Sequence, residues 1–286
     1  MSGDKTFSSG VGAASTGIEV ASSGTANTIG SIVELDASTE SEANGIVVTV
    51  ASVGVVAATN ISFLLNILTG PASSEVSLID GIHFGQDLSV SNFTRQAWFF
   101  PVNIPSGTRV SATCQTDTAS ADSVFVLCQF NSKSYSSQPG HQTITSVGHD
   151  TSTSNSTITV DAGGVANTKG SWATVLAAGS NPGFDGFSLS IGPNLNTAEA
   201  NADFLIDIAK GASQTVVVEN IFCSSTSTEN RYQNDTFFPI KIEAGELISI
   251  RSQCTSIDAT DRVRSIVFHG ANTQQAVVSN VLTTVI

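Results

Sequence analysis

The chain has 286 residues, enough for one large or two ordinary domains, and 40% of them are hydrophobic, which is enough to fill packed cores. Acidic residues outnumber basic ones by 24 to 11, giving a net charge of −13. This charge argues against a nucleic-acid-binding surface and against binding to an anionic membrane, because both kinds of binding rely on Lys and Arg.

The N-terminal residues 1–15 (MSGDKTFSSGVGAAS) lack the basic start and the apolar run of a signal peptide. A stretch of about 18 apolar residues, as a membrane-spanning helix needs, is also absent from the sequence. We therefore expect synthesis in a cytoplasm, and we predict that residues 1–15 form an arm outside the folded part of the chain.

Runs of β-branched and aromatic residues follow the arm, with turn residues between them. In the run 108–114, for example, Val110, Ala112 and Cys114 alternate with polar residues, as in a strand with one buried face. The strands expected in the first part of the chain are 17–20, 31–36, 45–52, 61–68, 75–82, 97–104, 108–114 and 123–130. Eight short strands at this spacing predict an all-β, antiparallel β-sandwich, of which the jelly roll is the commonest eight-stranded form.

The sequence then repeats itself with an offset of about 140 residues. The block GTANTIGS at 24–31 returns as GVANTKGS at 164–171, and FLLNI at 63–67 returns as FLIDI at 204–208. Two further blocks keep the same order: EVSLIDGI at 75–82 matches QTVVVENI at 214–221, and FFPVNI at 99–104 matches FFPIKI at 237–242. The offset changes only in polar or Gly-containing connections, where a loop gains or loses a residue at little cost.

The repeat predicts two tandem β-sandwich domains. We place the first at 16–130 and the second at 156–269, with a Ser/Thr/Gly-rich linker at 131–155 between them and a C-terminal tail at 270–286. Because the arm and the tail lie outside the repeats, we expect one of them to cross to a neighbouring copy in an assembly.

Most repeated residues have a structural explanation. Asn27 and Asn167 suit a turn in which Asn adopts a positive φ, although a ligand contact stays an alternative. In each FFP block one ring is expected in the core, while the other, Phe99 or Phe237, faces a partner or solvent. The proline after each pair of rings predicts an edge position or a bulge.

The residues with reactive side chains do not form a recognisable catalytic pattern. Cys114, Cys128, Cys223 and Cys254 have no metal-site spacing and are interpreted as buried, reduced core residues. His83 and His269 do not recur between the repeats, and we interpret both as structural. The sequence contains no GxSxG, P-loop, dinucleotide or HExxH motif, and its repeats reproduce no pair of carboxylates suited to glycoside hydrolysis.

We predict no cofactor and no metal site. Calcium held by loop carboxylates stays an alternative, and its candidate ligands are Asp235, Asp258 and Asp261.

The repeated blocks, at 24–31, 63–70 and 99–107 and again at 164–171, 204–211 and 237–245, resemble structural proteins of tailed bacteriophages of marine and aquatic bacteria. The resemblance covers both repeats but neither the arm nor the linker. It implies a component of the virion that is made in the cytoplasm of a bacterial host. Ile29 where the second copy has Lys169, and Asn66 where it has Asp207, imply that the two copies have diverged in surface role.

The leading hypothesis is therefore a non-catalytic virion protein, either a capsid decoration or accessory protein or a component of a tail or fibre. Its expected partners are other virion proteins and further copies of itself. A carbohydrate- or receptor-binding module with host surface glycan as partner is the alternative, and a glycan depolymerase is a third possibility. The candidate interaction surface comprises Asn27, Trp98, Phe99, Asn167, Trp172 and Phe237.

Overall fold

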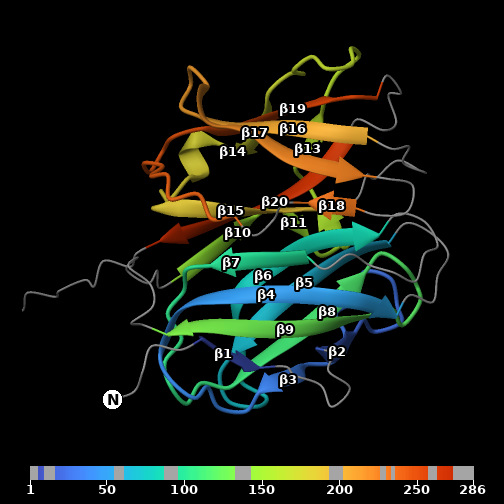
Figure 1. Ribbon diagram of the computed structural model, residues 1–286, viewed down its shortest axis with the longest axis vertical. Helices are drawn as coiled ribbons and strands as arrows, with labels where there is room; N and C mark the ends of the chain where they lie inside the picture. Colours follow the sequence, from blue (N-terminus) through green and yellow to red (C-terminus); the bar gives the residue numbers. More distant parts are fainter. Residues whose placement is uncertain are drawn as a thin grey trace, which may run out of the picture.

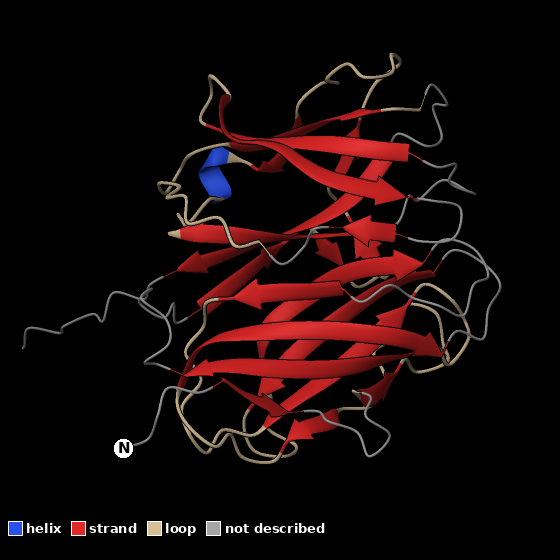
Figure 2. Cartoon of the chain, viewed as in Figure 1, coloured by secondary structure: helices blue, strands red, loops and turns tan. Residues whose placement is uncertain are grey.

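The computed structural model describes residues 6–9, 17–54, 61–86, 96–132, 143–192, 202–225, 230–232, 236–256 and 263–272, and all structural statements below refer to these residues. Strands make up nearly all of their regular structure, with a short 3-10 turn at Ala178–Ser180, and every paired strand runs antiparallel (Figures 1 and 2). The predicted all-β fold is thereby confirmed.

Strands of residues 6–132, called the first half below, form two sheets. One has the order β1-β9-β4-β7, with β2 also paired to β9, and the other has the order β3-β8-β5-β6. The bounds are β1 Thr6–Ser9, β2 Ile18–Ala21, β3 Val33–Asp36, β4 Ala43–Gly54, β5 Ile61–Thr69, β6 Val76–Gln86, β7 Gln96–Phe100, β8 Val110–Thr116 and β9 Ser123–Ser132.

Strands of residues 143–272, called the second half, build two larger sheets and a small hairpin, β11-β12. One sheet has the order β10-β20-β13 with β15 also on β20, and the other has the order β14-β19-β16-β17-β18. The bounds are β10 Thr143–Val147, β11 His149–Asp150, β12 Asn155–Ser156, β13 Thr159–Asp161, β14 Ala173–Leu176, β15 Gly186–Ile191, β16 Ala202–Lys210, β17 Thr215–Ser225, β18 Asn230–Tyr232, β19 Ile248–Cys254 and β20 Val263–Asn272.

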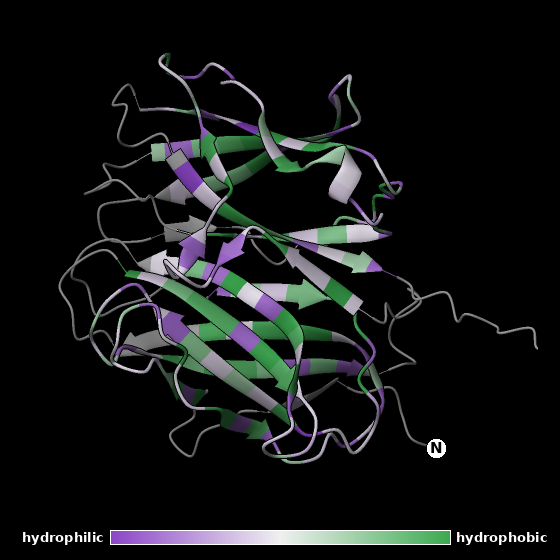
Figure 3. Ribbon diagram, turned by 180° about the vertical axis from the view of Figure 1, so that it is seen from behind, coloured by the Kyte–Doolittle hydropathy of each residue, from purple (hydrophilic) through white to green (hydrophobic). Residues whose placement is uncertain are grey.

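Buried apolar side chains gather in two clusters, one in each half, and each cluster draws on both sheets of its half. In the first half, Phe63 stacks on Phe84 with ring centroids 5.2 Å apart, and Phe84 meets Trp98 of the opposite sheet at 5.7 Å. Hydrophobic and hydrophilic residues alternate along the strands, as one buried and one outward face require (Figure 3). All four cysteines are buried and none forms a disulfide, as predicted.

Matched blocks of the repeat occupy corresponding strands. The order β3-β8-β5-β6 in the first half is the order β14-β19-β16-β17 in the second. Pairing of β5 with β6 shifts register around Ile67, and pairing of β16 with β17 shifts around Ile208, which is the matching residue. Two independently folding domains stay a prediction, but the two halves share this sheet order and these irregularities.

The turn that carries Asn27 and Asn167 is built in the same way in both halves. Both residues have φ of 57°, the positive value that Asn tolerates. Their backbone N–H groups donate to Thr116 O at 2.7 Å and to Cys254 O at 2.8 Å. These hydrogen bonds tie the turn to the end of β8 in one half and of β19 in the other, which explains why the block recurs.

Two segments outside the predicted repeats also belong to the sheets. β1, from the predicted arm, pairs with β9 of its own chain, and β10, from the predicted linker, pairs with β20. Phe7 lies opposite Phe130 and Thr145 lies opposite Gly270. Since Phe130 and Gly270 pair in turn with the matching residues Ile46 and Phe187, β1 and β10 are matching strands. Both strands contain few apolar residues, so the hydrophobic pattern of the sequence did not predict them. Of the predicted tail, residues 270–272 continue β20, and 273–286 lie outside the described residues.

Gly170, in the repeated turn of the second half, provides a test of the close packing of this turn. A Cβ atom on Gly170 would lie 2.5 Å from Asp161 O, whereas a Cβ on Gly179 would meet no atom within 4 Å. We expect Gly170→Ala to lower the free energy of unfolding by about 1–3 kcal/mol, because overpacking forces the backbone to shift. Gly179→Ala should change it by less than about 0.5 kcal/mol. Urea unfolding of both variants would measure this, and equal stability of the two would contradict the geometry.

Candidate interaction surface

The two halves meet along two edges of the sheets of the first half. β6 and β7 are edge strands, and an edge leaves unpaired backbone N–H and C=O groups. Ser190 Oγ on β15 accepts the backbone N–H of His83 in β6 at 2.9 Å, and Ser188 Oγ donates to the carbonyl of Phe99 in β7 at 2.9 Å. Two serines on one strand of the second half therefore cap two edges of the first half, and we call this contact the junction.

Both histidines that the sequence left without a functional role lie in the junction, and both are fully buried. His83 Nδ1 is 3.2 Å from the carbonyl of Phe63, which can only accept, so Nδ1 carries the proton and Nε2 accepts from Ser265 Oγ at 2.8 Å. His269 lies 2.8 Å from Ser190 Oγ through Nε2 and 2.8 Å from Ser146 Oγ through Nδ1. Ser190 thus links the backbone of His83 to the ring of His269 across the junction.

At two positions of the junction, a neighbouring side chain lies so close to the backbone that only glycine fits. A Cβ on Gly192 would lie 1.8 Å from His83 Nε2, and a Cβ on Gly81 would lie 2.4 Å from the Cβ of His149. Gly81 also has φ of 60°, and its match in the second half is Asn220, with φ of 58°. The backbone geometry is therefore retained in both halves, and in the first half the Cβ of His149 is a neighbour that requires glycine.

The hairpin β11-β12 extends the junction over the outer face of the first half. Gln115 Nε2 donates to Thr151 O and to Ser154 Oγ, each at 2.9 Å. Ser62 Oγ donates to Ser154 O at 2.7 Å. Asp150 shapes the hairpin by accepting the N–H and the hydroxyl of Ser152. The hairpin therefore seals the outward residues of β5 and β8 from solvent.

The matching face of the second half carries no such cover among the described residues. We call it the open face and define it as the outward side of β16, β17 and β19. Its residues Asp203, Leu205, Phe222 and Gln253 correspond to Ser62, Leu64, His83 and Gln115 of the first half. The first-half residues are all at most 1% exposed, whereas Phe222 is 47% exposed, Asp203 is exposed and the other two are half-buried.

A charged cluster lies beside the open face. Asp207 accepts from Lys169 Nζ at 2.7 Å and from Arg251 Nε at 3.0 Å, and the guanidinium carbon of Arg251 lies 4.4 Å from the ring centre of Trp172. Burial alone would raise the pKa of Asp207, but hydrogen bonds from Lys169, from the Asn220 N–H and from Arg251 lower it. The cluster pairs one carboxylate with two cations, and it ties Lys169 and Arg251 to β16 beside the face.

In the first half the same positions carry neutral residues. Asn66 stands in place of Asp207 and Thr113 in place of Arg251, and Asn66 Nδ2 donates to Thr113 Oγ1 at 3.3 Å. Ile29 and Ile32, which match Lys169 and Trp172, are 48% and 47% exposed. The predicted divergence of the two copies is visible in these side chains.

The structure does not bring the six sequence candidates together. Asn27 and Asn167 mark turns in different halves, and Trp172 lies under Arg251 beside the open face. Trp98 is 0% exposed and belongs to the core of the first half, so it is no surface residue: its place on β7 points between the two sheets. Phe99 and Phe237 meet each other at 6.3 Å across the junction, so within this chain the outer ring of each FFP block has the other as its partner.

Sequence reasoning missed Arg264, which is fully buried on β20, with its guanidinium carbon 4.2 Å from the ring centre of Phe204. A single Arg in an apolar run is normally a surface residue, so no pattern indicated this cation–π contact. The same applies to Ser188, Ser190 and Ser265, because serine is too common in this chain for its position to be informative.

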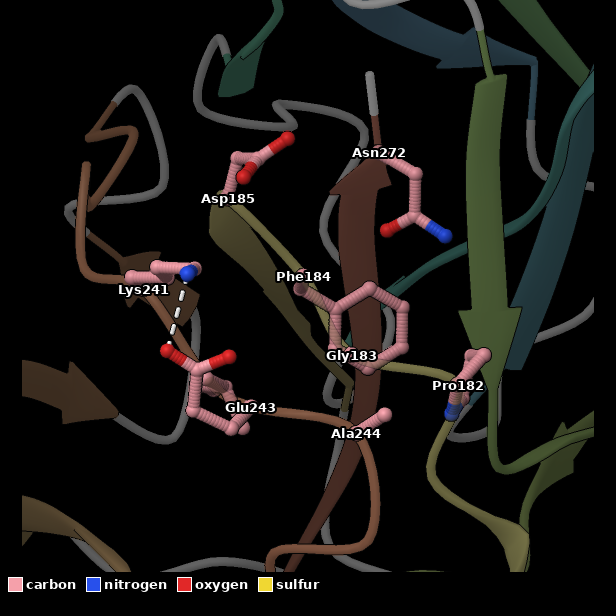
Figure 4. Close-up of a pocket in the computed structure, with 9 residues that line it drawn as sticks. Pro182, Gly183, Phe184, Asp185, Lys241, Glu243, Ala244 and Asn272 are labelled. Atoms are coloured by element: carbon pink, nitrogen blue, oxygen red, sulfur yellow. Dashed lines mark ion pairs between the residues drawn. The ribbon is translucent and has the colours of Figure 1, made fainter. Parts of the chain in front are cut away.

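A hollow of about 480 Å³ lies beside the start of β15. Figure 4 shows the residues that line it. Its rim carries an ion pair between Lys241 and Glu243 at 2.8 Å, and both side chains are largely exposed. The hollow is lined by Pro182, Gly183, Phe184, Asp185, Lys241, Ile242, Glu243, Ala244 and Asn272. Its charged side chains are Asp185, Lys241 and Glu243, and the lining contains no Ser, Cys or His.

Within the described ranges, no group of three or more His, Cys, Asp or Glu residues could hold a metal ion. The calcium candidates Asp235, Asp258 and Asp261 lie outside these ranges. The described part of the chain also contains no helix with the length and apolar character needed to cross a membrane.

Comparison with known proteins gives no family. No protein-family model matches the chain, and no curated protein matches it in sequence. Among solved structures, the tandem CBM22 domains of Paenibacillus barcinonensis Xyn10C match with 12% identity and a TM-score of 0.29, over 96% of this chain and 92% of theirs.

Infectious bursal disease virus, Gx strain, matches with 13% identity and a TM-score of 0.20, over 94% of this chain and 75% of that one. Vicilin from Capsicum annuum matches with 9% identity and a TM-score of 0.17, over 85% and 75%. TM-scores this low support neither a common topology nor a common function.

The buried histidines predict a loss of stability in mild acid. Burial lowers the pKa of His83 to about 4 and that of His269 to about 3, from an ordinary value of 6.5. Below pH 6.5 the unfolded chain therefore binds protons that the folded chain does not, and stability falls as the pH approaches 4. Urea midpoints between about pH 7 and about pH 4.5 should decline steadily.

His83→Gln removes one of these titrating groups, so it should flatten part of the decline. A midpoint that stays constant over this range in the unsubstituted protein would contradict the burial of neutral histidines.

Proposed function

We propose that this chain is a non-catalytic structural protein of a bacteriophage particle, acting either as a capsid decoration or accessory protein or as a component of a tail or fibre. One observation carries the proposal. The repeated unit packs onto a copy of itself through a buried junction, in which Ser188 and Ser190 cap two sheet edges and a hairpin covers a sheet face. A unit that already associates with its own copy is suited to building an assembly.

Two further features support an assembly role. The side chains that could react are part of the packed structure, since His83 and His269 are buried in the junction and all four cysteines are buried. Burial raises the pKa of the Cys114, Cys128 and Cys223 thiols. Burial raises the pKa of Cys128 to about 12, so its thiolate is not a nucleophile at neutral pH. The repeated blocks that resemble phage structural proteins supply the turns and core strands of this scaffold.

Particle association is the direct test. Phage particles purified through a density gradient from a lysate of the source bacterium should contain this chain in a fixed ratio to the major capsid protein. Immunogold labelling with antibodies against the purified protein should then place it on either the head or the tail. Recovery of the chain only in the soluble fraction, with none in intact particles, would refute the proposal.

Glycan binding is the second candidate, because Trp172 is a half-buried aromatic residue that lies against Arg251 of β19. Stacking of a sugar on this ring competes with Arg251, whose guanidinium carbon lies 4.4 Å from the ring centre. Saturable binding of host surface polysaccharide that is lost in Trp172→Ala but kept in Trp98→Phe would favour this candidate.

The absence of catalysis is tested with the same polysaccharide. Asp80 and Glu219 are equivalent in the repeat but lie in different halves, and Asp80 is held by the hydroxyl of Ser77. We expect no new reducing ends after prolonged incubation, because glycoside hydrolysis needs two carboxyl groups that face each other and these two lie in different halves. Sustained release that disappears in Asp80→Asn or Glu219→Gln would overturn the non-catalytic assignment.

A further inference from the structure

We propose that the open face of the second half binds the outward side of β4 and β9 in a second copy of this chain, so that copies stack head to tail. This inference deepens the proposed function and rests on it. The junction between the two halves of one chain is the template for the contact, because it joins the same two kinds of surface.

In the junction, β15 and β20 cover His83 of β6. Ser190 Oγ of β15 accepts the His83 N–H at 2.9 Å, and Ser265 Oγ of β20 lies 2.8 Å from His83 Nε2. Both serines alternate with core residues along their strands, so they lie on the outward side of the sheet that the two strands share. The outward side of β15 and β20 is therefore the surface that covers a strand of the β6 kind.

Each half has one surface of each kind. Within the described ranges, the junction uses the β6 side of the first half and the outward side of β15 and β20 of the second half. Two surfaces are left over: the open face, where Phe222 matches His83, and the outward side of β4 and β9, the strands that match β15 and β20.

Sheet pairing gives the register of the match between these strands. Ile46 matches Phe187, because each lies opposite the second ring of its FFP block. Ile46 also lies opposite Phe130, as Phe187 lies opposite Gly270, so Phe130 matches Gly270. Counting along the strands from these residues gives the matches on the outward side, which are Val47 with Ser188, Thr49 with Ser190, Phe125 with Ser265 and Leu127 with Val267.

The two surfaces that are left over differ from the junction in the same way, because both are more apolar. The open face presents Phe222, 47% exposed, where the junction has His83. The outward side of β4 and β9 presents Val47 and Phe125 at positions where the junction has serines. A Phe ring cannot bond to serine hydroxyls, but it packs well against Val and Phe side chains. Each of these surfaces therefore fits the other better than it fits either surface of the junction.

The side chains that a second copy would meet on β4 and β9 are uncharged. Val47, Phe125 and Leu127 are half-buried, whereas Thr49 is 3% exposed and lies between Leu127 and Ala97, its partners in the sheet. The three larger side chains therefore form the surface of contact.

Strand β18 determines how the open face can be bound. It pairs with Cys223–Ser225, the residues of β17 that directly follow Phe222. Because this part of the backbone edge is already bonded, the serine capping seen in the junction is not repeated here. The contact with the second copy relies on side chains, and the exposed ring of Phe222 is its centre.

The two surfaces lie in different parts of the molecule. β16 and β17 lie near the top of Figure 1, and β4 and β9 lie in its lower part. They are too far apart to meet within one chain, so the contact joins two copies. Because the two surfaces differ, each copy can bind one neighbour at each end, and the product is a filament or a ring.

Two variants that each block one surface test the contact. Phe222→Asp places a charge on the open face, and Leu127→Asp places one on the outward side of β4 and β9. The unsubstituted protein should form species larger than dimers in sedimentation velocity as its concentration rises, in salt that screens the repulsion between copies of net charge −13. Each variant alone should associate at least about tenfold more weakly, a loss of about 1.4 kcal/mol of contact energy.

Mixing the two variants distinguishes a head-to-tail contact from a symmetric one. A Phe222→Asp copy keeps its β4 and β9 side, and a Leu127→Asp copy keeps its open face. An equimolar mixture should therefore form dimers and no larger species. A contact between two open faces would instead let Leu127→Asp copies associate by themselves.

Control variants separate association from folding. Val165→Asp, at a residue 64% exposed on a turn of the second half, should associate as the unsubstituted protein does. If circular dichroism shows that Leu127→Asp does not fold, Phe125→Ser replaces it, because the same position of the scaffold holds Ser265 in the second half.

The outcomes also separate this inference from the proposed function. The head-to-tail contact is overturned if the unsubstituted protein stays monomeric, if Phe222→Asp leaves association unchanged, or if the folded variants form no dimers when mixed. Each of these results would stand even if the chain is found in particles. Association that depends on both surfaces supports the contact, and the particle assay then decides the virion assignment by itself.

Discussion

Every sandwich of separate sheets ends in edge strands, and the unpaired backbone groups along those edges must be bonded or exposed to water. In this protein the first half ends at β6 and β7, and the second half supplies two serine hydroxyls that bond to them. Hydroxyls suit this role because each can accept from an N–H or donate to a carbonyl. The relative placement of the two halves depends on this edge capping.

The junction contains polar side chains that are buried, and these side chains form hydrogen bonds with one another and with the backbone. His83 and His269 are buried as neutral rings, and each finds its hydrogen bonds among serines and backbone carbonyls. Such a network is costly when only partly satisfied, so the two halves are expected to hold one arrangement. The same network makes the junction the part of the protein that is most sensitive to acid.

Duplication preserved the scaffold and left the outward side chains free to change. The turn at Asn27 and Asn167 and the register shifts beside β5 and β16 are the same in both halves. The faces differ, because an outward position tolerates Asn or Asp, and His or Phe, without altering the core. One face became the internal junction, while its match carries an ion-pair cluster and an exposed Phe222.

Local sequence determined the strands, the repeat and the buried cysteines, because alternation of apolar residues and turn chemistry act over a few neighbouring positions. The predicted run 61–68, for example, is β5 at Ile61–Thr69. Tertiary structure alone decided that Trp98 is a core residue, that β1 and β10 complete the sheets, and that Ser190 links His83 to His269. These features depend on contacts between residues far apart in the sequence, such as His83 and Ser190, which are 107 positions apart. Local periodicity carries no information about such contacts.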